Sequence, residues 1–117
     1  MTAEHVFENQ LINLLRNKGI FAHHFDANGV DGWPDILCLH RNTSMLIEVK
    51  YRTIKLRTDQ TAFRIYMRSL FGYINIFTVA KMDAEFLFID STTKPPITTR
   101  HKSLINLVDH IAIYFKE

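Results

Sequence analysis

The fold of this chain is decided by two apolar runs and the polar turn between them, Gly32-Trp33-Pro34-Asp35-Ile36-Leu37-Cys38-Leu39-His40, residues 41–44 and Met45-Leu46-Ile47-Glu48-Val49-Lys50-Tyr51. Each run has the length of a strand, so the pattern predicts a β-hairpin. Glu48 and Lys50 lie two residues apart, and strand side chains alternate between the faces of a sheet, so both point to one face. Ionisable groups inside an apolar run are costly to bury. The hairpin therefore indicates a functional site as well as a core.

The register of this hairpin decides whether Asp35 joins Glu48 and Lys50. A turn with an even number of residues, centred on Asn42-Thr43, places Asp35 opposite Lys50, and opposed residues share a face. A turn of three residues would send Asp35 to the other face. We therefore expect an even turn, with all three ionisable side chains on one side of the sheet.

Three other segments have the apolar spacing of amphipathic helices. The first opens at Thr2 or Ala3 and ends before Gly19, the second covers residues 58–70 and ends before Gly72, and the third covers residues 101–115. The second helix is expected to turn four apolar side chains inward: Phe63, Tyr66, Met67 and Leu70.

Strands and loops account for the remaining chain. Strands are expected at residues 20–25, 35–40, 45–51, 73–80 and 85–89, and loops at residues 26–32 and 91–99, where Gly, Asp and Pro gather. The resulting order, α-β-β-β-α-β-β-α, predicts an α/β fold in which helices flank a mixed sheet. A length of 117 residues suits one domain spanning residues 1–117.

Composition and charge narrow the class of protein. The chain is 47% hydrophobic and 22% charged, which is typical of a globular domain. Its net charge of +2 indicates little, but six basic residues lie in one short stretch that holds a single acid, Asp59: Lys50, Arg52, Lys55, Arg57, Arg64 and Arg68. The single cysteine suits a reducing compartment, and we find neither a signal-peptide pattern nor an apolar run that could span a bilayer. We therefore expect a cytoplasmic protein without a membrane partner.

The ionisable residues of the hairpin suit phosphodiester hydrolysis. That reaction needs an activated water, neutralised phosphate charge and help for the leaving oxygen, and Mg²⁺ or Mn²⁺ held by carboxylates supplies much of this. We expect Asp35 and Glu48 to bind the metal, with the Val49 carbonyl as a further oxygen donor. Lys50 would hold or deprotonate the attacking water, or stabilise the pentacovalent phosphate.

The same residues carry a family resemblance. Pro34-Asp35 followed by Glu48-Val49-Lys50 resembles the signature of the PD-(D/E)xK nuclease superfamily. The wider pattern, which also includes Gly32, Ile47, residues 56–60 and Gly72, is similar to the small stand-alone VRR-NUC nucleases of phages and prophages, and to archaeal-type Holliday junction resolvases. The resemblance covers residues 8–79, leaves the C-terminal third without a counterpart, and implies a restriction-endonuclease-like fold.

The resemblance also implies roles for residues outside the hairpin. An acid on the first helix joins the site in that family, and Glu8 fits better than Glu4. The family's glutamine on the second helix corresponds to Gln60, which would position metal-bound water or Lys50. Family members often have Ser or Thr three residues before that glutamine, whereas this chain has Arg57, which puts the cap of the helix in doubt. The implied activity is Mg²⁺- or Mn²⁺-dependent DNA cleavage by a homodimer that acts on branched DNA.

Several residues near the motif have more than one interpretation. Arg52, Lys55, Arg57 and Arg64 are expected to contact DNA phosphates, and the alternative is an ordinary hydrated rim. Trp33 would stack on a splayed base or only cover its loop. His23 and His24 face opposite ways on a strand, so they do not chelate one metal together, and Cys38 is expected in the core.

Three functions fit the sequence. The first is a structure-selective, dimeric endonuclease similar to the junction resolvases; two symmetric cuts need two sites, which a two-fold pair of small domains provides. Apolar residues off the main stripe of the last helix, Ile105, Ile113 and Tyr114, would face either the partner or the core. The second is a nickase, flap nuclease or general DNA nuclease of the same fold. The third is a non-catalytic DNA-binding module, against which the intact Asp35, Glu48 and Lys50 set argues.

Overall fold

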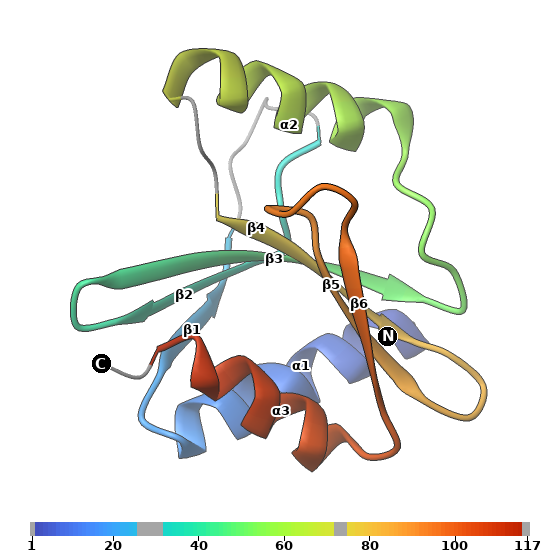
Figure 1. Ribbon diagram of the computed structural model, residues 1–117. Helices are drawn as coiled ribbons and strands as arrows, with labels where there is room; N and C mark the ends of the chain where they lie inside the picture. Colours follow the sequence, from blue (N-terminus) through green and yellow to red (C-terminus); the bar gives the residue numbers. More distant parts are fainter. Residues whose placement is uncertain (1, 26–31, 72–74, 116–117) are drawn as a thin grey trace.

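A six-stranded sheet with strand order β1-β2-β3-β4-β5-β6 forms the centre of the molecule (Figure 1). The computed structural model describes residues 2–25, 32–71 and 75–115. Its elements, in chain order, are α1 Ala3–Asn17, β1 Phe21–His24, β2 Ile36–His40, β3 Thr43–Tyr51, α2 Thr58–Phe71, β4 Ile76–Lys81, β5 Phe86–Asp90, β6 Ile97–His101 and α3 Leu104–Ile113.

The sheet is mixed, as the sequence predicts. Strands β1, β2 and β3 pair antiparallel, as do β4, β5 and β6, while β3 and β4 are parallel. A parallel pair needs a crossover connection, and α2 provides it. Figure 1 shows the result in layers: α2 lies on one face of the sheet, and α1 and α3 lie together on the other.

The β2–β3 hairpin has an even turn of two residues, Arg41 and Asn42. The parity of the sequence prediction is therefore confirmed, but the register differs by one residue pair. Ile36 lies opposite Ile47, so Asp35 comes beside Glu48, where we expected Lys50. The β-branched Thr43 already belongs to β3, which shortens the turn that we expected at residues 41–44.

The face of the sheet toward α1 and α3 carries the apolar core. Alternate residues of β2, β3, β4 and β5 are buried here against the two helices, as are the apolar stripes of the helices themselves: Ile36, Cys38, Met45, Ile47, Val49, Phe77, Val79, Phe88, Leu11, Leu15, Leu107 and Ile111. Tyr114 packs against this core as well, whereas Ile105 and Ile113 are exposed. The predicted core position of Cys38 is confirmed.

The first helix begins and ends at the residues that its sequence indicates. The Thr2 hydroxyl accepts a hydrogen bond from the His5 backbone N–H, which caps the N-terminus. Gly19 follows the last turn with a φ of +82°, a conformation that glycine adopts without steric cost and that commonly ends a helix.

The sequence prediction missed the sixth strand. Residues 91–99 were expected to form a loop and residues 101–115 a helix, but Ile97–His101 pairs antiparallel with β5. Ile97, Thr98 and Thr99 favour strands, and an edge strand tolerates the prolines that precede it. The last helix begins only at Leu104, where the Ser103 hydroxyl accepts from the Asn106 N–H.

The predicted inward face of α2 was also wrong in part. Phe63 is buried, but Tyr66 and Leu70 are 60% and 55% exposed. The buried stripe consists instead of Gln60, Phe63 and Arg64, which are neighbours on a helix surface. The helix turns a polar stripe inward because the sheet beneath it is polar at that point. The expected stop at Gly72, the strand start at residues 73–74 and most of the loop at residues 26–32 lie outside the described residues.

Candidate active site

Asp35 and Glu48 form a carboxyl pair at the start of the hairpin. The Asp35 N–H donates to the Ile47 carbonyl at 3.1 Å, and its Oδ2 accepts from the Val49 N–H at 2.7 Å, so the carboxylate takes the place of a ladder acceptor. Glu48 is only 2% exposed, and its carboxyl is hydrogen-bonded to that of Asp35. The hairpin thus brings the two predicted acids into direct contact.

The electrostatics of this pair favour a bound proton. Burial raises the pKa of Glu48 to about 9, and the hydrogen bond and charge of Asp35 act in the same direction. The nearby Lys50 and Arg64 oppose that shift of the Glu48 pKa without reversing it. At neutral pH the pair therefore shares a proton, because two adjacent carboxyls in a buried site do not both ionise.

Lys50 is held beside the pair by the first turn of α2. Its side chain is 7% exposed, and its Nζ donates to the Gln60 Oε1 at 2.7 Å. The same Gln60 oxygen accepts from the Arg57 backbone N–H at 2.8 Å. Gln60 therefore supplies half of a capping box while it also orients Lys50. The Asp59 Oδ1 accepts from the Gln60 N–H at 3.0 Å and so takes the place of the missing Ser or Thr.

Gly32 lets the chain before β2 lie against the start of α2. Its φ is +80°, and a Cβ added there would come within 2.1 Å of the Asp59 carbonyl oxygen and 3.0 Å of the Gln60 nitrogen. Such distances leave no room for a side chain. The glycine of the motif thus serves to bring the Asp35 strand and the Gln60 helix together.

Arg64 of α2 lies near Glu48, and its positive charge opposes the rise in the pKa of Glu48. Arg64 is 8% exposed, and its guanidinium donates to the Thr78 hydroxyl at 3.0 Å; Thr78 is the β4 partner of Glu48. Burial lowers the pKa of Arg64, and the charge of Glu48 opposes that effect. Arg64 is thus buried, unlike Arg52, Lys55 and Arg57, which we also expected to contact DNA and which are exposed. Its signal in the sequence was its spacing, four residues after Gln60 on one helix.

Glu8 approaches the pair from the other side of the sheet but has a different partner. It is buried, and its Oε1 lies 3.1 Å from Nδ1 of His24, whose Nε2 lies 2.9 Å from Asn9. Burial and then the charge of Asp35 raise the pKa of Glu8. Within residues 2–25, 32–71 and 75–115, no group of three His, Cys, Asp or Glu side chains is placed to hold a metal together.

The remaining predicted contacts lie around this centre. Trp33 stacks on Phe25 at 4.9 Å between ring centroids and meets Phe63 edge-on at 4.9 Å, which favours the packing interpretation. Arg52, Lys55 and Arg57 are exposed, and Arg52 and Arg57 lie 3.4 and 3.2 Å from the acids Asp83 and Asp59. These three residues form a cationic rim that is partly balanced by acids.

The donor set fits a hard divalent cation. Mg²⁺ is commonly bound by one or two carboxylates together with water and substrate oxygens, and the Asp35–Glu48 pair offers two carboxylates. Their shared proton marks a position where positive charge offsets carboxylate repulsion.

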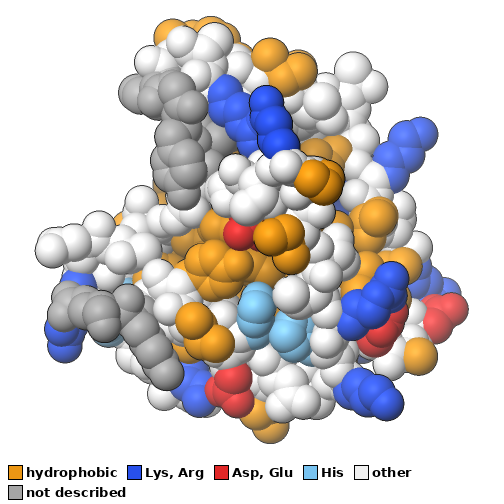
Figure 2. Space-filling model, viewed as in Figure 1, with side chains coloured by type: hydrophobic (Ala, Val, Ile, Leu, Met, Phe, Trp, Pro, Cys, Tyr) orange, Lys and Arg blue, Asp and Glu red, His pale blue; other side chains and the backbone are white. Residues whose placement is uncertain are grey.

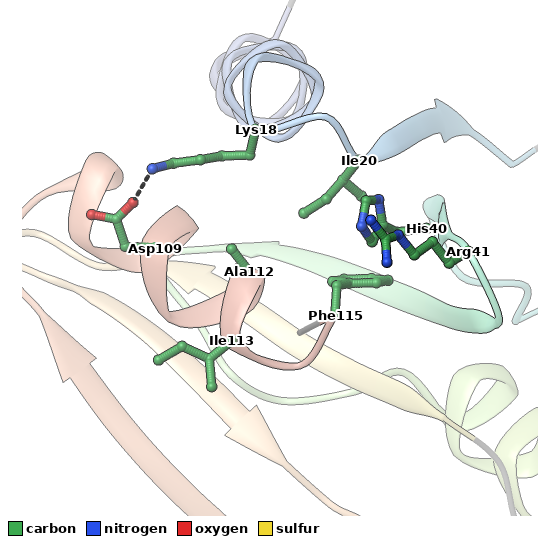
Figure 3. A pocket seen from close by; sticks show the side chains of 8 residues that line it. All are labelled: Lys18, Ile20, His40, Arg41, Asp109, Ala112, Ile113 and Phe115. Carbon is green, nitrogen blue, oxygen red and sulfur yellow. Dashed lines mark ion pairs between the residues drawn. The ribbon is translucent and has the colours of Figure 1, made fainter. Parts of the chain in front are cut away.

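A cavity of about 770 Å³ lies away from Asp35 and Glu48. It is lined where α1 ends, at the β2–β3 turn and along α3, and includes an ion pair of 2.6 Å between Lys18 Nζ and Asp109 (Figure 3). None of the predicted site residues lines it. The size of a cavity alone therefore does not identify the candidate site.

Comparisons with known proteins give information on the fold. The chain matches no protein-family model, and no curated protein is significantly similar to it. Its fold is similar to the solved structure of Archaeoglobus fulgidus Hjc, a Holliday junction resolvase from an archaeal hyperthermophile, with a TM-score of 0.56, 24% identity, and coverage of 88% of this chain and 92% of that chain. This likeness shows that the α/β fold is that of Hjc. Among the described helices, none combines the length and apolarity that crossing a membrane would need.

Proposed function

We propose that this protein is a metal-dependent DNA endonuclease of the PD-(D/E)xK type, close to the stand-alone VRR-NUC nucleases. The observation that carries the proposal is the contact between Asp35 and Glu48, with Lys50 held beside them by Gln60. The likeness of the fold to that of Hjc supports it. Such an enzyme would act on DNA inside the cell.

The residues divide the work of phosphodiester hydrolysis. Asp35 and Glu48 would hold Mg²⁺ or Mn²⁺, with the Val49 carbonyl as a further donor and Glu8 reaching the site through water. A metal held there would neutralise charge on the phosphate and lower the pKa of a water. Lys50, oriented by Gln60, presents its ammonium to the reacting phosphate or water, and Arg52, Lys55 and Arg57 contact flanking phosphates.

We further propose that the substrate is branched DNA and that the enzyme is a homodimer. Two symmetric cuts require two sites, and the described part of the chain provides one such site at Asp35 and Glu48, so a two-fold pair of chains is the simple solution. Apolar side chains are exposed on α2 and on α3, at Ile65, Tyr66, Leu70, Ile105 and Ile113. Sedimentation of the wild type beside Ile65→Lys and Ile113→Lys would show whether a dimer forms and which helix it uses.

The test of the proposed activity is cleavage of a set of end-labelled DNAs. Four-way junctions, flaps, nicked duplex and linear duplex are incubated with Mg²⁺, with Mn²⁺ and with EDTA. The proposal expects metal-dependent cuts, fastest at junctions, that Asp35→Ala abolishes. If linear duplex is cut as fast as junctions, the protein is a general nuclease and the preference for branched DNA is contradicted. If the protein binds DNA but cuts none of these substrates, it is a non-catalytic DNA-binding module.

A further inference from the structure

A second, smaller groove of about 360 Å³ lies between α2 and the connection from β5 to β6. Figure 1 shows this connection rising from the sheet toward α2. The Arg68 side chain ties the two together, since its Nη2 donates to the Ser91 carbonyl at 2.8 Å. The groove is thus a feature of two elements that are far apart in sequence.

The charge of this groove is one-sided. Three of its lining residues are cationic, Arg64, Arg68 and Lys94, and none of the described residues that line it is an acid. Figure 2 shows two Lys or Arg side chains side by side over α2. Like charges that gather without a counter-ion repel one another, so an anion between them would be stabilised.

Arg64 gives the groove a fixed charge. Arg64 is buried, with 8% of its surface exposed, and its guanidinium is anchored by the hydrogen bond to Thr78. A guanidinium has five N–H donors, and one such bond leaves most of them for another acceptor. Burial lowers the pKa of Arg64. The positive charge of Arg68 lowers it further, as expected for two cations that lie near each other.

We propose that this groove binds a phosphate of the DNA substrate. This phosphate would be the neighbour, on the same strand, of the phosphate that is cut at Asp35 and Glu48. Arg64 connects the two places, because it lines the groove while it also lies within electrostatic reach of Glu48. The inference rests on the proposed function for the identity of the strand. Ile65 and Pro96, which also line the groove, offer apolar surface to the sugar beside that phosphate.

The site would position DNA without reading its sequence. Guanidinium and ammonium groups bind phosphate through charge and hydrogen bonds, and such contacts are the same for every base. Each cation that neutralises a phosphate also makes binding depend on salt. Loss of Lys94 should therefore weaken binding by about 3- to 10-fold at low salt and reduce the salt dependence.

The groove can be tested without cleavage, by nuclear magnetic resonance in EDTA with thymidine 3′,5′-bisphosphate as the probe. We expect its addition to shift the backbone amide signals of residues 61–68 and 91–94. Lys94→Ala should lower the affinity for the bisphosphate. The control is Lys102→Ala, which removes an exposed lysine on the connection from β6 to α3 and should leave that affinity unchanged. Arg68→Lys, which keeps the charge, should bind more tightly than Arg68→Ala.

The proposal of a phosphate-binding groove and the proposal of nuclease activity can be contradicted separately. Signals that shift elsewhere, or equal affinity in wild type and Lys94→Ala, would overturn the groove even if the wild type cuts DNA. Shifts at the groove in a protein that cuts no DNA would support the anion site and overturn the proposed enzyme. Binding of inorganic phosphate with the same affinity as the bisphosphate would show a site for free phosphate and contradict a nucleotide site.

Discussion

The face of the sheet that packs on α1 and α3 buries apolar side chains, whereas the face beneath α2 buries Glu48, Lys50 and Thr78. One strand serves both, because β3 alternates Ile47 and Val49 on the first face with the ionisable pair on the second. The helices differ in the same way: α1 and α3 contribute apolar stripes, and α2 contributes Gln60 and Arg64.

This difference separates the side of the sheet that stabilises the fold from the side that carries the candidate site. Burial of apolar surface is the main favourable contribution to folding, and it is concentrated on the α1 and α3 side. Polar groups buried under α2 contribute little net stability even when hydrogen-bonded, and removing one partner is costly. The α2 side is therefore best understood as a site that the other side holds in place.

The largest expected effect separates two residues of β3 that face opposite sides of the sheet. Lys50→Met should lower the rate of DNA cleavage by about 10²–10⁴-fold while the free energy of unfolding changes by only about 1 kcal/mol, because the Gln60 Oε1 still accepts from the Arg57 N–H. Met45→Ala, in the apolar core, should lower the free energy of unfolding by about 2 kcal/mol or more and keep the cleavage rate per folded molecule. Cleavage assays and urea unfolding on both variants measure this. Similar losses of activity in both would contradict the division of the faces.

A pair of glycines tests how the two sides are joined. Gly32 and Gly19 both have positive φ, at +80° and +82°, but only Gly32 has backbone where a Cβ would lie. Gly32→Ala should displace Gln60 and lower the cleavage rate by about 10²-fold, as a misplacement of about 1 Å can. Gly19→Ala carries the same backbone strain and should leave the rate unchanged. Equal rates in the two variants would show that the close approach has no role in activity.

The pH dependence of stability should come from the α2 side. The pKa of Glu48 is raised from 4.5 to about 9, so the folded state holds this proton more tightly than the unfolded chain does. Its contribution to the free energy of unfolding is complete below pH 4.5 and is lost as pH rises toward 9, with a slope of up to about 1.4 kcal/mol per pH unit.

Urea unfolding in EDTA between about pH 5 and pH 9 measures that slope. Glu48→Gln should flatten it. Glu8→Gln should reduce it less, because the hydrogen bond of His24 opposes the rise in the pKa of Glu8, whereas the hydrogen bond of Asp35 adds to the rise in the pKa of Glu48. A Glu48→Gln variant with the slope of the wild type would rule out the shared proton.

Hydrogen exchange should show the smallest of these differences. Helix α2 is held by a few polar contacts and by Phe63 against Trp33, whereas α3 packs Leu107, Val108 and Ile111 fully into the core. We expect the amides of α2 to open with a free energy lower than those of α3 by about 1–3 kcal/mol. Equal protection of both helices would mean that the polar side is as stable as the apolar side.

The hairpin could be predicted from the sequence because strand side chains alternate strictly between the two faces of a sheet. An even turn and a two-residue spacing are sufficient to bring Asp35, Glu48 and Lys50 to one face, and an error of one residue pair in the register leaves that result intact. The opposite applies to α2. Its inward face was derived from apolar residues alone, so Tyr66 and Leu70 were assigned inward although the sheet below offers polar partners.

Two other features required the tertiary structure. The β6 strand is short, follows two prolines and pairs at an edge, and local preference alone does not distinguish it from a loop. The roles of Gln60 and Gly32 depend on a close approach between segments far apart in sequence, and hydrophobic periodicity carries no information about it.

The central claim is that Asp35 and Glu48 form a centre for a divalent cation, and the most direct measurement is anomalous diffraction from crystals soaked in Mn²⁺. The account predicts one strong peak within about 2–2.5 Å of a carboxylate oxygen of each residue, and its loss in Glu48→Gln crystals. A peak bound elsewhere, or no anomalous peak between the two carboxyls at saturating Mn²⁺, would contradict it.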